Sequence, residues 1–151
     1  MRSKHQRRIE DFMLLAGQEV KYFPRIPTDE IRKLRATLIF EEARETLDAL
    51  GFGVEITGPH PKDFNLIGGE TCNIIEVADG CADISVVTIG TLSAFGISDK
   101  PLLKEVDESN LRKFGPGGYR REDGKWIKPP DWKSPDIEGV LVKQGYPKIG
   151  V

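Results

Sequence analysis

Histidine and cysteine are scarce in this 151-residue chain, which has two of each. His5 and His60 fall in no metal-ligand spacing, and no glutamate is followed three residues later by a histidine, which excludes a di-iron bundle of the Glu-x-x-His type. Cys72 and Cys81 lie nine positions apart on one predicted helix, so they cannot pair with each other. We therefore expect two buried thiols in a reducing compartment.

Apolar residues make up only 38% of the chain, and the formal net charge is -2. A chain of this length fits one domain, and small helical domains with a low apolar share often complete their core by oligomerising. The balanced charge provides no global field for nucleic acid or a membrane. No apolar run is long enough to span a bilayer and no signal peptide opens the chain, so we expect a cytoplasmic protein.

Helical periodicity and end signals predict four helices, at residues 4–16, 29–50, 71–95 and 99–113. Thr28 and Ser98 are suitable N-caps for the second and fourth of these helices. The glycine-rich segment 51–70 between the second and third helices is predicted to be a long loop, with a strand-like stretch at Val54–Thr57.

Glycines and prolines crowd the chain from Gly115 onward, where the helical pattern disappears. The sequence therefore predicts an all-α fold, in which a four-helix-type bundle is completed by oligomerisation and followed by an extended C-terminal arm. In this division residues 1–114 form the helical domain, and residues 115–151 form an arm that does not pack as a regular element.

Carboxylates dominate one face of each of the two longest predicted helices, and six of them stand out: Glu41, Glu42, Glu45, Glu76, Asp79 and Asp83. Spacings of three and four place each set on one helix face, in line with apolar residues such as Leu34 and Leu38. Burying an unpaired carboxylate costs on the order of several kcal/mol, so a cation must compensate these groups. Because every donor is a hard oxygen, we expect two to three Mg²⁺ or Mn²⁺ ions.

The pattern Glu41-Glu42-x-x-Glu45 followed by Glu76-x-x-Asp79 resembles the MazG-type all-α nucleoside triphosphate pyrophosphohydrolases. This superfamily includes phosphoribosyl-ATP pyrophosphohydrolase and the dimeric dUTPases. A second resemblance, to the phage and bacterial branch, is carried by Glu105-Val106-x-x-Ser109-Asn110-x-x-Lys113 and Asp123-Gly124-Lys125-x-x-Lys128. One departure is Gly80, where one alignment would place a glutamate. The alignment on Glu76-x-x-Asp79 keeps the motif intact.

The resemblance implies hydrolysis of a (d)NTP to a (d)NMP and pyrophosphate. Glu41 and Glu42 are the candidate catalytic residues, with Glu41 as a bridging ligand or as the base on the attacking water. The candidate metal ligands are Glu41, Glu42, Glu45, Glu76, Asp79 and Asp83, and the contact of Asp83 with metal can be direct or indirect. The phage-like tail suggests a role in the deoxynucleotide pool, in a host cytoplasm if the gene is carried by a phage.

Side chains on the tail are candidates for binding the substrate. Lys113, Lys125 and Lys128 can pair with phosphate oxygens as mobile point charges. Asn110 offers a donor and an acceptor for a base edge. Trp126 can stack on a base or pack at a subunit interface. These residues favour a purine substrate such as dGTP.

Three readings compete with this one. Within the enzyme class, phosphoribosyl-ATP is the alternative substrate. A catalytically inactive, nucleotide-binding helical oligomer is the second class. A nucleic-acid-binding module would need a basic stripe with interleaved aromatic residues, and only the tail offers a thin version of one. The expected partners are therefore a nucleoside triphosphate and further copies of the chain, in a homodimer or homotetramer, without a membrane or nucleic acid.

Overall fold

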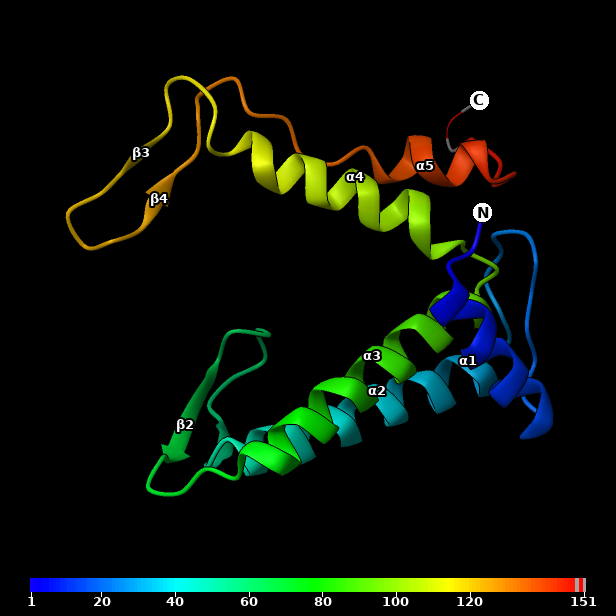
Figure 1. Cartoon of the computed structure of the whole chain (residues 1–151), viewed down its shortest axis with the longest axis horizontal. Coiled ribbons are helices and arrows are strands. Elements are labelled where there is room, and N and C mark those ends of the chain that lie inside the picture. Colours follow the sequence, from blue (N-terminus) through cyan, green and yellow to red (C-terminus); the bar gives the residue numbers. More distant parts are fainter. Residues whose placement is uncertain (149, 151) are drawn as a thin grey trace. The chain divides into compact units, whose positions relative to one another are not determined.

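The computed structural model describes residues 1–148 and 150, and these are mostly helical (Figure 1). The chain forms two compact units. We call Pro27–Thr91 the helix-pair unit, and Met1–Ile26 together with Leu92–Val151 the terminal unit. Each unit is described by itself below.

The four predicted helices are confirmed, with ends that differ from the prediction by at most three residues: α1 is Lys4–Leu15, α2 is Asp29–Ala49, α3 is Ile74–Ala94 and α4 is Asp99–Arg112. Thr28 caps α2, because its hydroxyl accepts a hydrogen bond from the Ile31 amide at 3.5 Å. Ser98 occupies the N-cap position of α4, but its side chain makes no capping hydrogen bond. End signals in the sequence thus located the helices even where the expected cap does not form.

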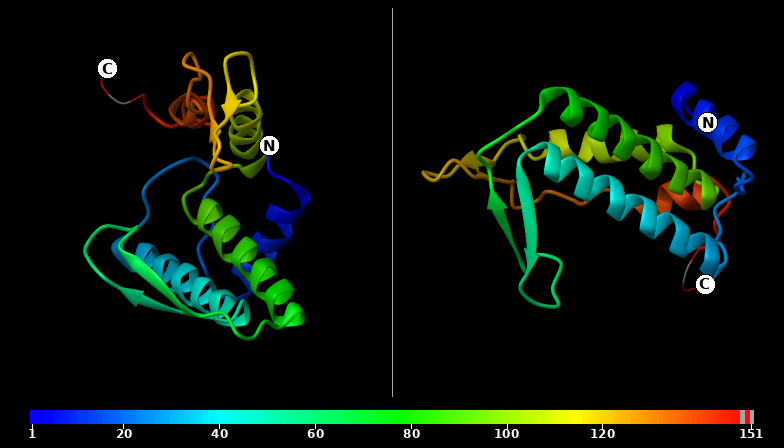
Figure 2. Two further views of the ribbon diagram at one scale, coloured as in Figure 1. Left: turned by 90° about the vertical axis from the view of Figure 1, so that its left-hand side faces the viewer. Right: turned by 90° about the horizontal axis from the view of Figure 1, so that it is seen from below.

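In the helix-pair unit, α2 and α3 lie side by side (Figures 1 and 2). The segment between them is a β-hairpin of β1 (Phe52–Ile56) and β2 (Phe64–Gly68). The predicted strand-like stretch at 54–57 lies largely on β1, whereas the prediction of a loop for the rest of the segment was wrong. Val54 and Ile56 on β1 pair with Leu66 and Phe64 on β2, which places four exposed apolar side chains on one face of the hairpin. The alternation of apolar residues with period two on β1 favours a strand despite the flanking glycines. The fold is therefore mostly helical rather than all-α.

The terminal unit is organised around the fully buried side chain of Gln6 on α1. Its amide nitrogen donates to Ser93 Oγ at 3.0 Å and to the Ile97 carbonyl at 2.8 Å, and its amide oxygen accepts from the Asp99 amide at 2.9 Å. Ser93 in turn donates to Glu10 Oε1 at 2.8 Å. These bonds tie α1 to the turn between the end of α3 and α4.

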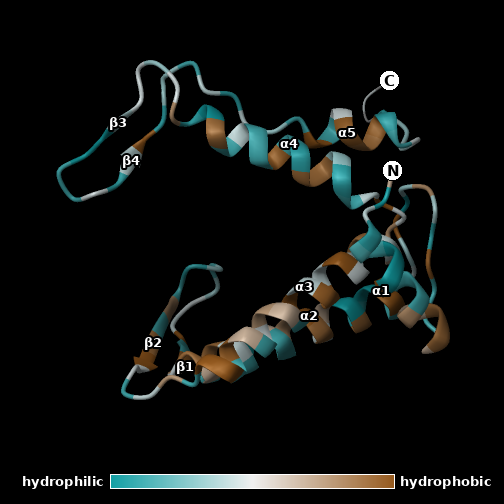
Figure 3. Cartoon of the chain, viewed as in Figure 1, coloured by the Kyte–Doolittle hydropathy of each residue, from teal (hydrophilic) through white to brown (hydrophobic). Residues whose placement is uncertain are grey.

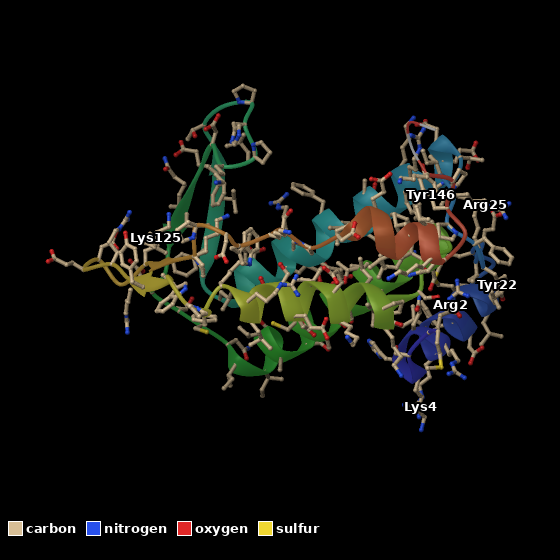
Figure 4. The ribbon with its side chains drawn as sticks, turned by 90° about the horizontal axis from the view of Figure 1, so that it is seen from above. Arg2, Lys4, Tyr22, Arg25, Lys125 and Tyr146 are labelled. Carbon is tan, nitrogen blue, oxygen red and sulfur yellow. The ribbon has the colours of Figure 1, made fainter. Side chains whose placement is uncertain are left out.

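Gly96 forms that turn with φ of +76°, which favours glycine. A Cβ atom there would lie 2.1 Å from the Phe23 carbonyl oxygen, so space also requires glycine. Nearby, Arg2 lies over the Tyr22 ring at 5.0 Å from its centroid, and both side chains are labelled in Figure 4. The N-terminal segment is therefore packed against the end of α3 rather than loose.

The segment beyond Gly115 is more ordered than the sequence indicates. It contains a short pair of strands, β3 (Tyr119–Arg120) and β4 (Trp126–Ile127), and a helix, α5 (Ile137–Lys143). The expectation of an arm without helix was wrong. Asp136 caps α5 by accepting from the Gly139 amide at 2.9 Å, Gln144 accepts from the Ser98 amide at 2.7 Å, and Val140 is buried.

Three structural expectations stay open. The division into residues 1–114 and 115–151, the bundle and its oligomerisation all remain predictions. Among the described residues no single helix is long and apolar enough to cross a membrane, and only α3 and α4 taken together, as a bent pair, meet that test. Figure 3 shows the apolar residues concentrated on α3 and on the hairpin.

Candidate active site

Five carboxylates line one pocket of about 280 Å³ in the helix-pair unit. Its lining residues are Glu45, Asp48, Ala49, Glu76, Asp79, Gly80 and Asp83. No lysine, arginine or histidine is among the lining residues that the structure describes. The pocket is therefore strongly anionic and suits a cation.

Helix geometry explains why these acids meet. Glu45 and Asp48 lie one turn apart at the end of α2, and Glu76, Asp79 and Asp83 lie on successive turns of α3. The two helices face each other through the small residues Ala49 and Gly80, which leave the space that the acids surround. Asp48 was missed from the sequence, although its spacing of three from Glu45 was a usable signal.

Gly80 lies where one alignment would place a family glutamate. A Cβ atom at this position would lie 2.4 Å from Thr46 Oγ1, so a longer side chain does not fit without movement of the helices. The assignment of the second half of the motif to Glu76 and Asp79 stays a prediction.

Glu42 shows the electrostatic state of the site. Its Oε2 atom is buried and has no hydrogen-bond partner among the described residues. Burial raises the pKa of the Glu42 carboxyl above its ordinary value, and repulsion from Asp83, Glu45, Glu41 and Asp79 raises it further. Glu42 therefore interacts electrostatically with carboxylates on both helices, although it does not line the pocket itself.

The six predicted site acids are less buried than the stripe argument indicates. Glu42 and Asp83 are half-buried, whereas the other four are exposed: Glu41, Glu45, Glu76 and Asp79. The desolvation argument therefore applies to two residues only. For the four exposed acids, the reason to expect a cation is the repulsion between neighbouring carboxylates.

The buried face of α2 also runs one residue away from the predicted one. Arg35 and Thr46 are buried, whereas Leu34 is 41% exposed. Arg35 is held there because its Nη2 donates to the Val87 carbonyl at 2.8 Å and its Nε donates to Thr91 Oγ1 at 3.1 Å. Burial lowers the pKa of the Arg35 guanidinium.

The prediction of two buried thiols was also wrong. Cys72 and Cys81 are both exposed. Cys72 precedes the first residue of α3, and Cys81 is on the solvent side of that helix, next to the buried Gly80. Neither thiol is therefore part of a buried face.

The donor set fits Mg²⁺ or Mn²⁺, because it consists of carboxylate oxygens and includes a buried Glu42 oxygen without a partner. The acids do not yet form a ligand cage, since no three His, Cys, Asp or Glu side chains in residues 1–148 and 150 are arranged as a preformed metal site.

A second cluster, which lies in the terminal unit, contains three of the predicted substrate-binding residues. Lys113 Nζ donates to Asn110 Oδ1 at 3.0 Å. The ammonium groups of Lys113 and Lys128 lie 5.3 Å and 4.1 Å from the centroid of the Trp132 ring, whose indole N–H donates to the Ser109 carbonyl at 2.9 Å. Neither lysine has a carboxylate partner within the described part of the chain, so both can pair with an anion.

The neighbouring residues Trp126 and Lys125 have different surroundings. Trp126 donates its indole N–H to the Lys113 carbonyl at 2.5 Å, and its ring centroid lies 4.9 Å from that of Phe114. This packing gives Trp126 a structural task at the end of α4. Lys125 is exposed on the turn between β3 and β4, as Figure 4 shows.

The family model for phosphoribosyl-ATP pyrophosphohydrolase matches residues 9–110, a span that includes both carboxylate motifs. The chain belongs to the phosphoribosyl-ATP pyrophosphohydrolase family. The resemblance noted in the sequence is therefore confirmed at the level of the superfamily, and the chain is related to pyrophosphohydrolases that act on acid anhydrides. No individual curated protein matches the sequence significantly. The matched span ends before Lys113, Lys125, Trp126 and Lys128.

Replacement of Glu42 by glutamine should stabilise this family member when metal is absent. Because the pKa of Glu42 is raised in the folded state, its ionised form destabilises the fold above the ordinary pKa of 4.5. Glu42→Gln should therefore raise Tm in EDTA at neutral pH. The gain should shrink below pH 4.5, where wild-type Glu42 is neutral as well.

Thermal unfolding followed by circular dichroism across this pH range checks the prediction. Glu70→Gln is the matched control, since Glu70 is exposed in the same unit and should leave Tm unchanged. A Glu42→Gln variant less stable than wild type at neutral pH would contradict the electrostatic description of the pocket.

Proposed function

We propose that this chain is a metal-dependent nucleoside triphosphate pyrophosphohydrolase that converts a (d)NTP and water into a (d)NMP and pyrophosphate. The observation that carries the proposal is the pocket of five carboxylates without a cation in its lining. Membership of a pyrophosphohydrolase family supports the reaction class. The proposed cofactors are two to three Mg²⁺ or Mn²⁺ ions, held by the pocket acids together with Glu41 and Glu42.

In this reaction the oxygen of water bonds to the α-phosphorus, the bond from that phosphorus to the α–β bridging oxygen breaks, and pyrophosphate leaves. The bound cations would neutralise phosphate charge, polarise P–O bonds and acidify water. Glu41 is the candidate base that would take the water proton, unless it bridges two cations, and Glu42 would bind a cation beside it.

The lysines proposed to pair with phosphate oxygens all lie in the terminal unit. Lys113, Lys125 and Lys128 carry charge that no carboxylate among the described residues neutralises. Asn110 lies beside Lys113 and offers its amide to a base edge. Trp126 is engaged with Phe114, so any contact with a base would use the exposed part of its ring. A purine deoxynucleotide such as dGTP is the proposed substrate.

Phosphoribosyl-ATP is the second candidate substrate, and the family match is the observation that favours it. Both candidates contain a nucleoside triphosphate group that loses pyrophosphate. A panel of the four dNTPs, the four NTPs and phosphoribosyl-ATP, assayed for pyrophosphate release with Mg²⁺, separates them. Binding without release of pyrophosphate would instead support an inactive nucleotide-binding oligomer.

Pyrophosphate release should require Mg²⁺ or Mn²⁺ and should stop in EDTA. Glu76→Gln keeps the shape of the side chain but removes a pocket charge, and it should slow turnover at least about 100-fold, as expected for loss of one electrostatic stabiliser of the transition state. Steady-state kinetics with Glu70→Gln as the control variant measures this effect. Near-native turnover of Glu76→Gln would show that this acid binds no catalytic metal.

Loss of a phosphate-binding lysine should raise KM. Lys125→Ala and Lys128→Ala should each weaken substrate binding by about 1–3 kcal/mol, the usual range for a charge-assisted hydrogen bond. Lys143→Ala, which changes an exposed lysine on α5, is the matched control. If KM is the same in all three variants, the terminal-unit lysines do not contact substrate.

The protein should form a homodimer or homotetramer. Only three apolar side chains of the helix-pair unit are buried (Ala49, Val87 and Ile89), whereas Ile74 and Ile75 are 80% and 78% exposed. A second copy would cover such residues, so Tm should rise with protein concentration. Light scattering at micromolar concentration gives the mass directly. A monomer with a concentration-independent Tm would contradict this proposal.

A further inference from the structure

A close contact between α2 and α3 lies beside the carboxylate pocket. It is formed by Gly80 on α3 and Thr46 on α2. A Cβ atom added to Gly80 would lie 2.4 Å from Thr46 Oγ1, 3.1 Å from Thr46 Cβ and 3.2 Å from Thr46 Cα. Gly80 is buried within its helix and is not among the glycines with positive φ, so space rather than backbone conformation requires a glycine here.

Thr46 cannot easily move away from this contact. Its side chain is 5% exposed, and its Oγ1 donates to the Glu42 carbonyl one turn earlier at 2.7 Å. Thr46 is β-branched and therefore stiff at χ1. The contact with Oγ1 is the only one of the three below 3.0 Å, and the bond to Glu42 holds that atom in place, so an added methyl group at position 80 would push the helices apart.

The Gly80–Thr46 contact lies next to acids of the pocket on both helices. Thr46 follows Glu45 directly, and Gly80 follows Asp79 directly and itself lines the pocket. A wider spacing of the helices would increase the distance between every acid on α2 and its neighbours on α3. Metal–oxygen distances tolerate changes of only about 0.2 Å, so a wider helix spacing would weaken the binding of any cation that takes ligands from both helices.

We propose that the Gly80–Thr46 contact is a positioning device, which sets the spacing at which carboxylates from α2 and α3 bind the same divalent cation. Neither residue binds the ion. The inference rests on the proposed metal-dependent function and adds to it two residues that carry no charge.

Binding of Mn²⁺ to the purified full-length chain, measured by calorimetric titration, tests the inference together with Tm in EDTA. Gly80→Ala should weaken Mn²⁺ binding at least tenfold and should lower Tm, whereas glycine-to-alanine changes inside helices normally raise stability. Gly53→Ala is the matched control, because the nearest atom to a Cβ there would be the Ile67 carbonyl oxygen, at 4.0 Å. It should leave Mn²⁺ affinity unchanged.

A second substitution at Thr46 distinguishes a change in helix spacing from a general loss of stability. Thr46→Ala in combination with Gly80→Ala removes Oγ1, the nearest atom, and should restore Mn²⁺ affinity to within threefold of wild type. Thr46→Ser in combination with Gly80→Ala keeps Oγ1 and its bond to Glu42, so it should not restore affinity. A purely structural role would lower Tm and leave the Mn²⁺ affinity of the folded protein unchanged.

Each result bears on the inference. Mn²⁺ binding by Gly80→Ala within twofold of wild type would overturn it. If Gly80→Ala does not fold, the double variant with Thr46→Ala decides: a folded protein with restored affinity supports the inference, and an unfolded or weakly binding one overturns it. A wild-type protein that binds no Mn²⁺ would overturn the metal-dependent function as well, which makes the two failures distinguishable.

Discussion

Repulsion between carboxylates on α2 and α3 is the constraint on which the site depends. Glu42 experiences burial and the charges of neighbours on both helices, and its pKa is raised accordingly. The buried cation on the same face of α2, Arg35, lies two turns away, or about 10 Å along the helix axis. Its Nη2 and Nε atoms donate to Val87 and Thr91. The chain thus holds a concentrated negative charge that a divalent cation would neutralise.

Close packing of small residues makes this concentration of charge possible. Gly80 and Ala49 allow the helices to approach, and Thr46 fills the contact between them. The unit has few buried apolar side chains with which to offset the repulsion. Bound cations and additional subunits would therefore contribute to stability as well as to catalysis, because anything that binds only the folded state stabilises it.

Local signals in the sequence predicted four of the five helices and named four of the five acids that line the pocket. The cap at Thr28 and the glycines after α1 and α2 located helix ends, and the spacings of Glu45, Glu76, Asp79 and Asp83 placed these acids together. Burial on α2 was harder to predict, because the stripe through Leu34 is more apolar than the one through Arg35. Hydrogen bonds to Val87 and Thr91 bury Arg35, and these partners are distant in sequence.

Short elements among glycines and prolines were the other difficulty. The hairpin 52–68 has the alternation of Val54 and Ile56, but the glycines around it favoured a loop. Helix α5 has only seven residues and an internal Gly139, so its pattern is too brief for periodicity to detect. Its stability comes from packing against α4 and from the cap at Asp136, which depend on tertiary structure.

The location of bound metal tests the central claim most directly. Crystals of the wild-type protein soaked in Mn²⁺ can be examined by anomalous scattering at the manganese edge. The account predicts peaks within ligand distance of the carboxylates of Glu45, Asp48, Glu76, Asp79 and Asp83. Anomalous peaks only elsewhere on the protein, or none at millimolar Mn²⁺, would contradict it.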